Sequence, residues 1–547
     1  ANVPDVRAPF LWRLLGALIR PWLKIKTEPP QPEQRLQNSD APVVYLLERY
    51  GLSNALILEE ACRQHQLPPP LMPMPGGHLR KQRSVLALSR REGSLLFGRP
   101  RNRTHSEGLA QLVSAVRANP ALDVRVVPVS IFVGRAPARE SGWFSVLFSE
   151  NWAMVGRFRR FLSVLLNGRD TIVHFSESIS LREVVSEGLD AERTVRKASR
   201  VMRAHFSRLR AAVIGPDLSH RRTLIDSVMN ADGVRQAIRS TASKESRPIQ
   251  QIEGRARSYA WEVAADYSHP AVRSASCLLK SGWTKLFDGI EVHHFDTLKQ
   301  VAPGHEVIYV PCHRSHMDYL LVSYLLYENG IVPPHIAAGV NLNLPIIGSL
   351  LRKGGAFFLR RSFKANAVYS AVFSDYVTQL FRRGASLEYF VEGGRSRTGR
   401  MLDPRAGMLA MTVKSFLAES RRPVVFQPVY IGYEKILEGK SYIGELSGKS
   451  KEKESLFGLL RSLKLLRERY GKVAVSFGEP IHLAEHLDAS APNWRQDARE
   501  NDRPEWFSNS VNRLADRIAV NINRSADVNP VNLLALALLA TPKHAMA

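Results

Sequence analysis

The chain has 547 residues, of which 44% are apolar, so it can form two or three globular domains and is too apolar to be disordered. Its formal net charge of +25 indicates an anionic partner: a nucleic acid, an anionic membrane, or an acidic carrier or substrate. The three cysteines, Cys62, Cys277 and Cys312, have no paired spacing, which argues against a disulfide framework or a cysteine zinc site.

Residues 10–26 combine basic and apolar side chains at helical spacing. Arg13, Arg20 and Lys24 share one face, and leucines and a tryptophan lie on the other. This pattern is typical of a helix in a membrane interface, although it also suits a helix packed on its own domain. There is no signal-peptide pattern and no run of about 18 apolar residues, so we expect residues 1–42 to be a membrane-associating segment and a Pro-rich linker.

Four short fragments recur in the same order in two parts of the chain. Residues 43–47 resemble residues 307–311, which lie 264 positions later. Three further pairs follow: 69–70 with 333–334, 126–129 with 425–429, and 175–179 with 477–481. Because internal similarity bears on every fold assignment, we interpret residues 43–183 as a diverged copy of a later domain at 301–490. Chance similarity between apolar strands is the alternative.

The same alignment predicts that the first copy is not catalytic. It places Arg49 where the later domain has His313, and Asn54 where that domain has Asp318. Residues 184–300 lack strand alternation and are rich in helix-forming residues, so we expect a helical connector. Its arginines are not interleaved with aromatic side chains, which argues against a nucleic-acid partner.

A histidine follows a predicted strand at the centre of the later domain. Residues 307–310 form a short apolar run, His313 comes next, and Asp318 precedes the apolar run 320–326, which predicts a helix. Open α/β sheets place their chemistry where strands end and helices begin. A carboxylate that fixes one histidine tautomer is the unit needed to deprotonate an alcohol.

Two arginine-rich segments follow this histidine. Gly354 and Gly355 lead into a short strand that ends in Arg360 and Arg361. A second predicted strand, 387–391, leads into a glycine-rich turn with the residues Glu392, Gly393, Arg395 and Arg397. Arginine forks bind phosphate, and glycines let backbone amides approach an anion. The P-loop spacing is absent, which disfavours ATP hydrolysis.

The last predicted elements are a strand at 424–431 and a helical segment at 491–547. The apolar run 531–539 predicts a helix with nothing left to pack against it, so we expect the native protein to continue beyond Ala547. No histidine cluster has a metal-ligand pattern, and we predict no metal site.

The motifs around His313, Arg361, Arg397 and the strand at 424–431 together resemble the glycerol-3-phosphate acyltransferase family, and its bacterial membrane-bound members in particular. The resemblance implies an acyltransferase-type α/β domain with a central mixed sheet, preceded by the diverged copy and the helical connector. It implies a peripheral protein on the cytoplasmic side of the bacterial inner membrane. Larger relatives continue further at the C-terminus, so this chain resembles a shortened member.

The resemblance also implies a reaction. His313 would take the proton from the 1-hydroxyl of glycerol 3-phosphate, and Asp318 would orient His313. The alkoxide would attack the thioester of acyl-CoA or acyl-carrier protein, giving lysophosphatidic acid without a cofactor. A backbone amide near the start of the next helix is our hypothesis for the oxyanion donor.

The implied substrate-binding residues are Arg361, Arg360, Glu392, Gly393, Arg395 and Arg397. Dihydroxyacetone phosphate or 1-acyl-glycerol 3-phosphate are alternative acceptors. A different class of protein, a non-catalytic basic protein that binds membranes or nucleic acid, is the remaining alternative. Cys312 is interpreted as a buried thiol rather than a nucleophile.

Overall fold

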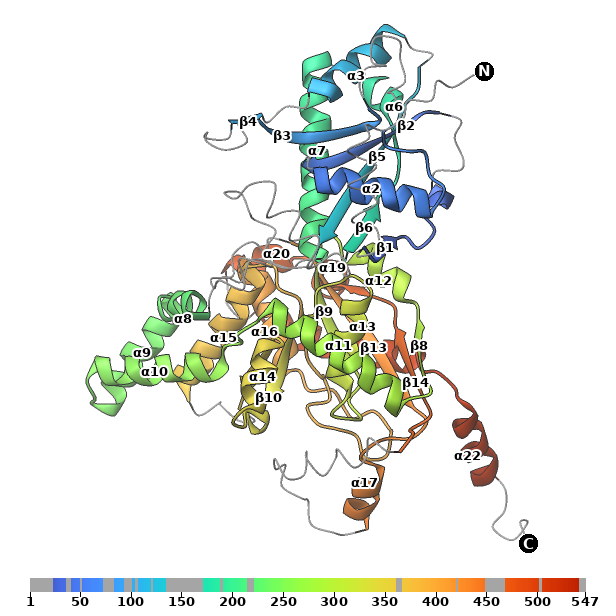
Figure 1. The fold of residues 1–547 in the computed structure, drawn as a ribbon. Helices are drawn as coiled ribbons and strands as arrows, with labels where there is room; N and C mark the ends of the chain where they lie inside the picture. The colour runs from blue at the N-terminus through green and yellow to red at the C-terminus, as the bar shows by residue number, and fades with distance from the viewer. Residues whose placement is uncertain are drawn as a thin grey trace. The chain divides into compact units, whose positions relative to one another are not determined.

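The computed structural model describes residues 23–35, 41–49, 52–71, 83–92, 101–103, 107–119, 122–133, 171–186, 190–213, 221–360, 366–419, 422–447, 468–500 and 504–540. The chain divides into two units, Ala1–Val213 and Ile214–Ala547 (Figure 1). Within the described residues, no helix combines the length and the apolarity needed to cross a bilayer.

A mixed sheet is the centre of the first unit. Its strands lie in the order β1 (Ile25–Glu28), β6 (Thr171–Phe175), β5 (Arg125–Val133), β2 (Val43–Arg49), β3 (Val85–Glu92) and β4 (Arg101–Arg103), and β7 (Ile179–Ser180) pairs with β5. The described helices of this unit are η2 (Pro32–Arg35), α2 (Leu52–Gln64), α3 (Glu107–Ala118), α6 (Leu181–Ser186) and α7 (Ala191–Val213).

Helices cover both faces of this first sheet. Successive side chains of a strand point to opposite faces, and β2 shows the consequence. Tyr45 and Leu47 belong to the core formed with α2, whereas Val44 and Leu46 belong to the core formed with α3 and α7. A strand that is buried on both faces reads as a continuous apolar run, as residues 43–47 do.

The second unit contains a larger mixed sheet. Its strands lie in the order β11 (Ala356–Leu359), β10 (His335–Gly339), β12 (Leu387–Glu388), β9 (Glu306–Pro311), β13 (Val424–Tyr433), β14 (Lys472–Phe477) and β8 (Gly289–His293), and β15 (Ile481–His482) pairs with β13. The sheet is parallel from β11 to β13, and β14 runs antiparallel to β13. The predicted mixed α/β fold is therefore confirmed.

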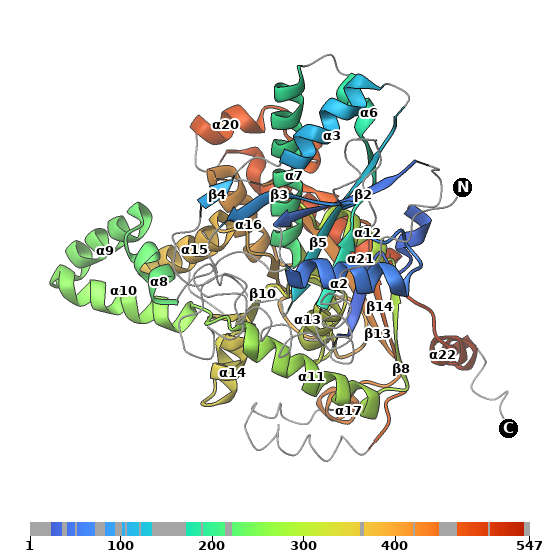
Figure 2. The same cartoon turned by 45° about the horizontal axis from the view of Figure 1, so that its top comes forward.

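The helices of the second unit pack on this sheet and on one another. They are α8 (Arg221–Met229), α9 (Asp232–Glu245), α10 (Ile249–Val263), α11 (His269–Leu286), α12 (Phe295–Val301), α13 (Asp318–Glu328), η5 (Val340–Leu342), α14 (Ile347–Lys353), α15 (Ala367–Arg382), α16 (Gly407–Glu419), α17 (Gly439–Leu446), α19 (Leu483–Ser490), α20 (Trp494–Glu500), α21 (Trp506–Arg524) and α22 (Pro530–Ala540). Helices α8, α9 and α10 form an arm beside α15 (Figures 1 and 2).

The two sheets share one strand connectivity. In the first unit β2 pairs parallel with β5, β5 pairs antiparallel with β6 and β7, and β6 pairs parallel with β1. In the second unit β9, β13, β14, β15 and β8 repeat these pairings. The register repeats as well, with these Cα partners: Leu46 with Pro128 and Val310 with Pro428, then Val129 with Phe175 and Val429 with Phe477. Three of the four aligned fragment pairs thus occupy equivalent places in the two sheets, and the fourth, 69–70 with 333–334, lies outside the strands.

Two predictions for segments that we expected to contain no strand are wrong in part. Ile25 and Lys26 belong to strand β1 rather than to a helix over 10–26, and the rest of that prediction, up to Trp22, lies outside the described residues. The connector at 184–300 is not wholly helical, because it contains β8. Both strands are short edge strands, and neither shows the clean alternation that would identify it. The bounds of the five predicted segments stay predictions.

The second sheet buries two carboxyl groups without hydrogen-bond partners among the described residues. Glu306 on β9 and Glu388 on β12 are 1% and 0% exposed. Burial raises the pKa of Glu306 to about 8. Burial, and then repulsion from Asp318, raises the pKa of Glu388 well above its ordinary 4.5. A buried carboxyl group with no cationic partner stays protonated because its charged form loses hydration.

We expect Glu388→Gln to flatten the pH dependence of stability. The folded protein keeps the Glu388 proton after the unfolded chain has lost it, so this group's contribution to the unfolding free energy falls as pH rises above 4.5. Urea titrations at pH 5 and pH 7 should show that the unfolding free energy of the wild type falls more than that of the variant over this interval. Glu253→Gln, at an exposed position on α10, is the matched control. Equal losses in wild type and Glu388→Gln would contradict a neutral Glu388.

Candidate active site

His313 and Asp318 meet at the end of the central strand of the second unit. Strand β9 ends at Pro311, and Asp318 is the first residue of α13, where a carboxylate is favoured by the helix dipole. His313 Nδ1 lies 3.1 Å from Asp318 Oδ2, and the Asp318 side chain is fully buried. The predicted histidine–carboxylate pair is therefore formed.

Asp318 is held by four donors. Its Oδ2 accepts from the backbone amides of Arg314 at 2.7 Å and Ser315 at 2.9 Å, as well as from His313. Its Oδ1 accepts from the hydroxyl of Tyr433 at 2.7 Å. These bonds compensate for the water that a buried carboxylate loses, and they fix its position. Tyr433 was missed at the sequence level because it lies 115 positions from Asp318.

The orientation of His313 follows from its neighbours. An ionised carboxylate only accepts hydrogen bonds, so Nδ1 carries the proton and Nε2 keeps a lone pair. The ring stacks on Phe390, with 3.8 Å between centroids and an interplanar angle of 18°. The His313 side chain is 15% exposed and lines a cavity of this unit. This is the geometry of a general base that faces a substrate.

Two further carboxylates brace the backbone around His313. Glu392 accepts from the amides of His313 and Leu402, each at 2.7 Å, and is 2% exposed. Glu438, in the loop before α17, accepts from the Ser315 hydroxyl at 2.9 Å and from the His316 amide at 2.9 Å. Glu392 is one of the predicted substrate-binding residues, and that role stays a prediction. In this structure its two oxygens accept the two backbone amides and so hold the turn.

These contacts bear on the predicted oxyanion donor. The amides of Arg314 and Ser315 bond to Asp318, the amide of His316 bonds to Glu438, and the amide of Met317 bonds to the Ser315 hydroxyl at 3.1 Å. A backbone amide between His313 and α13 is therefore not available in this arrangement, and that hypothesis is wrong for these four positions.

The predicted phosphate-binding arginines divide into two groups. Arg360 forms a two-pronged ion pair with Glu262 on α10, at 2.8 and 2.7 Å, and lies over the rings of Tyr259 and Tyr369. These contacts fix Arg360 at the wall of the cavity that His313 lines. Arg361 lies outside the described residues.

Arg395 and Arg397 contact residues in α17, the helix that follows β13, or just before it. Arg395 donates to the Tyr442 hydroxyl at 3.0 Å and lies 3.6 Å from Glu438. Arg397 donates to Glu445 at 3.1 Å. Both arginines line the same cavity as His313, and each is held by a carboxylate that a bound anion could compete with.

Gly393 makes room for one more arginine. Its φ is +64°, and a Cβ atom there would lie 2.8 Å from Cδ of Arg405. The left-handed conformation and this close approach both favour glycine. Arg405 also lines the cavity, and its guanidinium has no hydrogen-bond or ion-pair partner in the part of the chain that the structure describes. Arg405 carries no motif in the sequence, because it follows the glycine-rich turn by several positions.

The cavity has a volume of about 1990 Å³. This volume exceeds the roughly 300–1,000 Å³ of common small-molecule sites. The lining includes His313, Arg395 and Arg397 together with many apolar side chains of α11, α13, α14 and α16. This mixture of basic and apolar side chains suits a ligand with an anionic head and a long apolar part.

Cys312 lies beside His313 in sequence but not in the cavity. Its thiol is buried, and Sγ accepts from the amide of Ile431 at 3.2 Å. Burial raises the pKa of this thiol to about 12, so it is protonated at neutral pH. A buried neutral thiol is not a nucleophile, in agreement with the interpretation from sequence.

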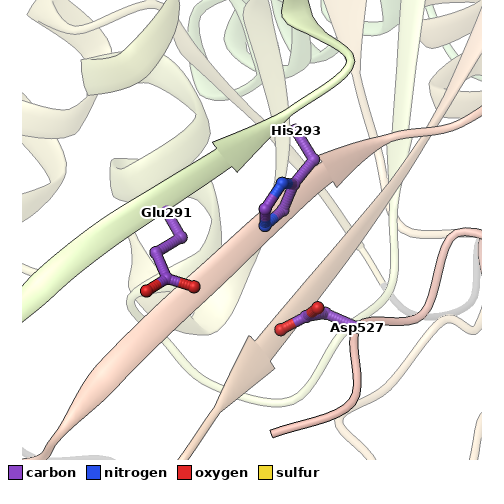
Figure 3. Close-up of side chains that lie close together, drawn as sticks. All are labelled: Glu291, His293 and Asp527. Carbon is purple, nitrogen blue, oxygen red and sulfur yellow. The ribbon is translucent and has the colours of Figure 1, made fainter.

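A separate cluster of possible metal ligands lies at the edge of the second sheet. The side chains of Glu291, His293 and Asp527 point toward one another, with ligand atoms within 4.8 Å (Figure 3). One oxygen of Glu291 bonds to Lys472 at 2.7 Å, so a cation would compete with this lysine. None of the three residues lines the cavity with His313.

Comparison with known proteins follows the same division of the chain. The family profile for the N-terminal domain of glycerol-3-phosphate acyltransferase PlsB matches residues 11–215. An acyltransferase profile matches residues 289–432, and the profile of the glycerol-3-phosphate acyltransferase C-terminal region matches residues 442–547. Among solved structures, the 1-acyl-sn-glycerophosphate acyltransferase of Thermotoga maritima shares 18% identity, covers 47% of this chain and 81% of its own, and has a TM-score of 0.28, too low to bear on the fold.

Several curated relatives match almost the whole chain. A glycerol-3-phosphate acyltransferase of Xanthomonas campestris pv. campestris is 60% identical, over 99% of this chain and 61% of its own length. Those of Xylella fastidiosa (strain 9a5c) and Pseudomonas fluorescens (strain Pf0-1) are 56% and 47% identical, over 63% and 65% of their own lengths. The chain thus spans about six tenths of the length of the curated relatives it matches. With this identity over nearly all of its residues, the chain belongs to the glycerol-3-phosphate acyltransferase family.

Proposed function

We propose that the protein transfers a fatty acyl group from acyl-CoA or acyl-carrier protein to the 1-hydroxyl of sn-glycerol 3-phosphate, giving lysophosphatidic acid. The observation that carries this proposal is the buried Asp318 that holds Nδ1 of His313 at 3.1 Å, with the histidine side chain in the lining of the cavity. The relatives named above act on glycerol 3-phosphate by their names, which supports the same acceptor here.

The proposed reaction needs no covalent enzyme intermediate. The 1-hydroxyl gives its proton to Nε2 of His313 as its oxygen forms a bond to the thioester carbonyl carbon. The tetrahedral intermediate then breaks its C–S bond, and the leaving thiolate takes the proton from the imidazolium. Asp318 stabilises that imidazolium through Nδ1, as the carboxylate of a catalytic triad does.

The arginines of the cavity lining are the proposed acceptor site. Arg395 and Arg397 would bind the phosphate of glycerol 3-phosphate by exchanging their contacts with Glu438 and Glu445 for charge-assisted bonds to the substrate. Arg405 would add a third guanidinium. Arg360, which is fixed by Glu262, would contribute positive potential at the wall, and Arg361 stays a prediction for the same site.

The apolar part of the cavity is the proposed site of the fatty acyl chain. When the thioester carbonyl carbon lies near His313, the fatty acyl chain can extend among the side chains of α11, α13 and α14. Burial of its methylene groups there stabilises the bound chain. We place the protein at the cytoplasmic side of the bacterial inner membrane, as a peripheral protein. Its net charge of +25 favours anionic lipid, acyl-carrier protein and the phosphates of CoA. No metal or cofactor enters this scheme.

We expect His313→Ala to abolish acyl transfer. Loss of the base and of its imidazolium should lower kcat by about 10⁴-fold or more, with the fold retained. The measurement is thiol release from palmitoyl-CoA and from palmitoyl-acyl-carrier protein, with and without glycerol 3-phosphate. Acceptor-dependent release at the wild-type rate from the His313→Ala protein would exclude His313 as the base.

Tyr433→Phe tests the support of Asp318. The substitution removes one of four hydrogen bonds to this carboxylate and leaves the ring in place. We expect kcat to fall by about 10-fold, because a bond to a charged group contributes about 1.5–3 kcal/mol and three donors remain. The KM for glycerol 3-phosphate should stay within about twofold, since the phenol does not contact the proposed phosphate site. Tyr470→Phe, which removes a buried hydroxyl that makes no hydrogen bond to Asp318, is the control. Equal rates in wild type and Tyr433→Phe would show that this contact does not position the base.

Arg397→Ala tests the acceptor site. The KM for glycerol 3-phosphate should rise by about 10–100-fold, and the KM for the thioester should change by less than about threefold. The matched control is Arg400→Ala, in the same turn but outside the cavity lining. An unchanged acceptor KM in Arg397→Ala would remove this residue from the phosphate site. A comparison with dihydroxyacetone phosphate and 1-acyl-glycerol 3-phosphate in the same assay would identify the preferred acceptor.

A further inference from the structure

Three aliphatic side chains stand exposed beside the apolar part of the cavity. Leu278 on α11 is 75% exposed, Ile346 before α14 is 83% exposed, and Leu350 on α14 is 60% exposed. Leu278 and Leu350 themselves line the cavity, as does Ile347, the neighbour of Ile346. Helix α11 packs against α14, so these residues come from adjacent elements of the second unit (Figure 1). We call Leu278, Ile346 and Leu350 the apolar rim.

The backbone at Ile346 is unusual for its residue type. Its φ is +69° and its ψ is −59°, and the amide of Ile347 donates to the carbonyl of Pro345 at 2.8 Å. These values define a classic γ-turn, which is rare and strained. A β-branched side chain adds to that strain. Strain of this kind persists where the local conformation has a use, and here it accompanies an isoleucine directed to the outside.

The turn places two of the rim residues on one surface. The amide of Leu350 donates to the carbonyl of Ile346 at 3.0 Å, so the two residues are one helical turn apart and their side chains share a face. Pro345 is exposed beside them, and its ring adds apolar surface. The resulting surface is aliphatic and contains no tryptophan, tyrosine or arginine anchor of the kind that protein interfaces favour.

We propose that the apolar rim inserts into a lipid bilayer, so that the apolar part of the cavity opens against the membrane. The proposal rests on the proposed function for its choice of lipid, because an acyl chain that enters or leaves this cavity passes the rim. Continuity between the rim and the cavity lining is the structural argument. The aliphatic side chains suit the acyl region of a bilayer, and the net charge of +25 favours anionic lipid. Unlike a protein partner, a bilayer does not need a surface that is complementary in shape to the rim.

Partition onto vesicles tests the proposal independently of turnover. The protein carries His313→Ala, and the vesicles contain phosphatidylethanolamine and phosphatidylglycerol. Ile346→Ser/Leu350→Ser should lower the partition coefficient by at least about tenfold, because each aliphatic side chain that leaves the lipid removes apolar burial. The matched control is Ile249→Ser/Val201→Ser, which removes two exposed aliphatic side chains elsewhere. Both proteins keep α22 and its exposed leucines unchanged, so the difference reports the rim alone.

A second measurement gives a positive signal for insertion. The chain has eight tryptophans of its own, so each variant is compared with the parent protein. Relative to the parent, Ile346→Trp should add emission that shifts to the blue on vesicle binding and is quenched by brominated lipid, whereas the emission that Ile249→Trp adds should show neither change. Equal partition of the rim variant and its control, or no quenching at position 346, would overturn the proposal. If the rim binds vesicles but the wild type shows no acyl transfer, the proposed function fails and the contact with lipid stands.

Discussion

The site depends on one buried charge. Asp318 is fully buried and yet accepts four hydrogen bonds, three from the loop between β9 and α13 and one from Tyr433 on the neighbouring strand. A buried carboxylate without such donors would be strongly destabilising, so the loop must adopt the conformation that supplies them. The same conformation sets the His313 tautomer and holds this side chain in the lining of the cavity. Glu392 accepts a hydrogen bond from the backbone amide of His313, and Glu438 accepts one from that of His316, so the two carboxylates hold the two ends of this loop. Three acidic side chains, those of Asp318, Glu392 and Glu438, therefore position His313, and of these three only Asp318 bonds to its ring.

The arginines of the site are also held in place by acidic side chains. Arg360, Arg395 and Arg397 each have an acidic partner, from α10, from the loop after β13 and from α17 respectively. A chain with a net charge of +25 repels itself most where arginines cluster, and these carboxylates neutralise the cluster in the folded protein. They also hold the guanidinium groups in place, so an anion of matching charge meets an arranged set of donors. Arg405 differs in having no such partner among the described residues.

The two units have the same strand connectivity, although they differ at the positions of His313 and Asp318. Both sheets join a central strand, a parallel neighbour and an antiparallel return in the same register. In the first unit the aligned positions carry Arg49 and Asn54, so the four-donor carboxylate has no counterpart in the sequence there. Two short edge strands, β1 and β8, extend the repeat beyond the predicted bounds. They were missed because an edge strand of four or five residues buries too little to impose a pattern on its sequence.

The sequence by itself determined the elements with local signals. The strand before His313, the helix that begins at Asp318, the glycine-rich turn and the repeated fragments all follow from apolar periodicity, spacing and internal similarity over a few residues. Tertiary structure alone decided which side chains meet across long separations. Tyr433 lies 115 positions from Asp318, and Glu262 lies 98 positions from Arg360. It also showed that Glu392 braces the backbone, and that Ile346 stands exposed in a γ-turn. A hydrogen bond or an ion pair between distant residues leaves no pattern in either segment, because its energy depends on the fold that brings the two groups together.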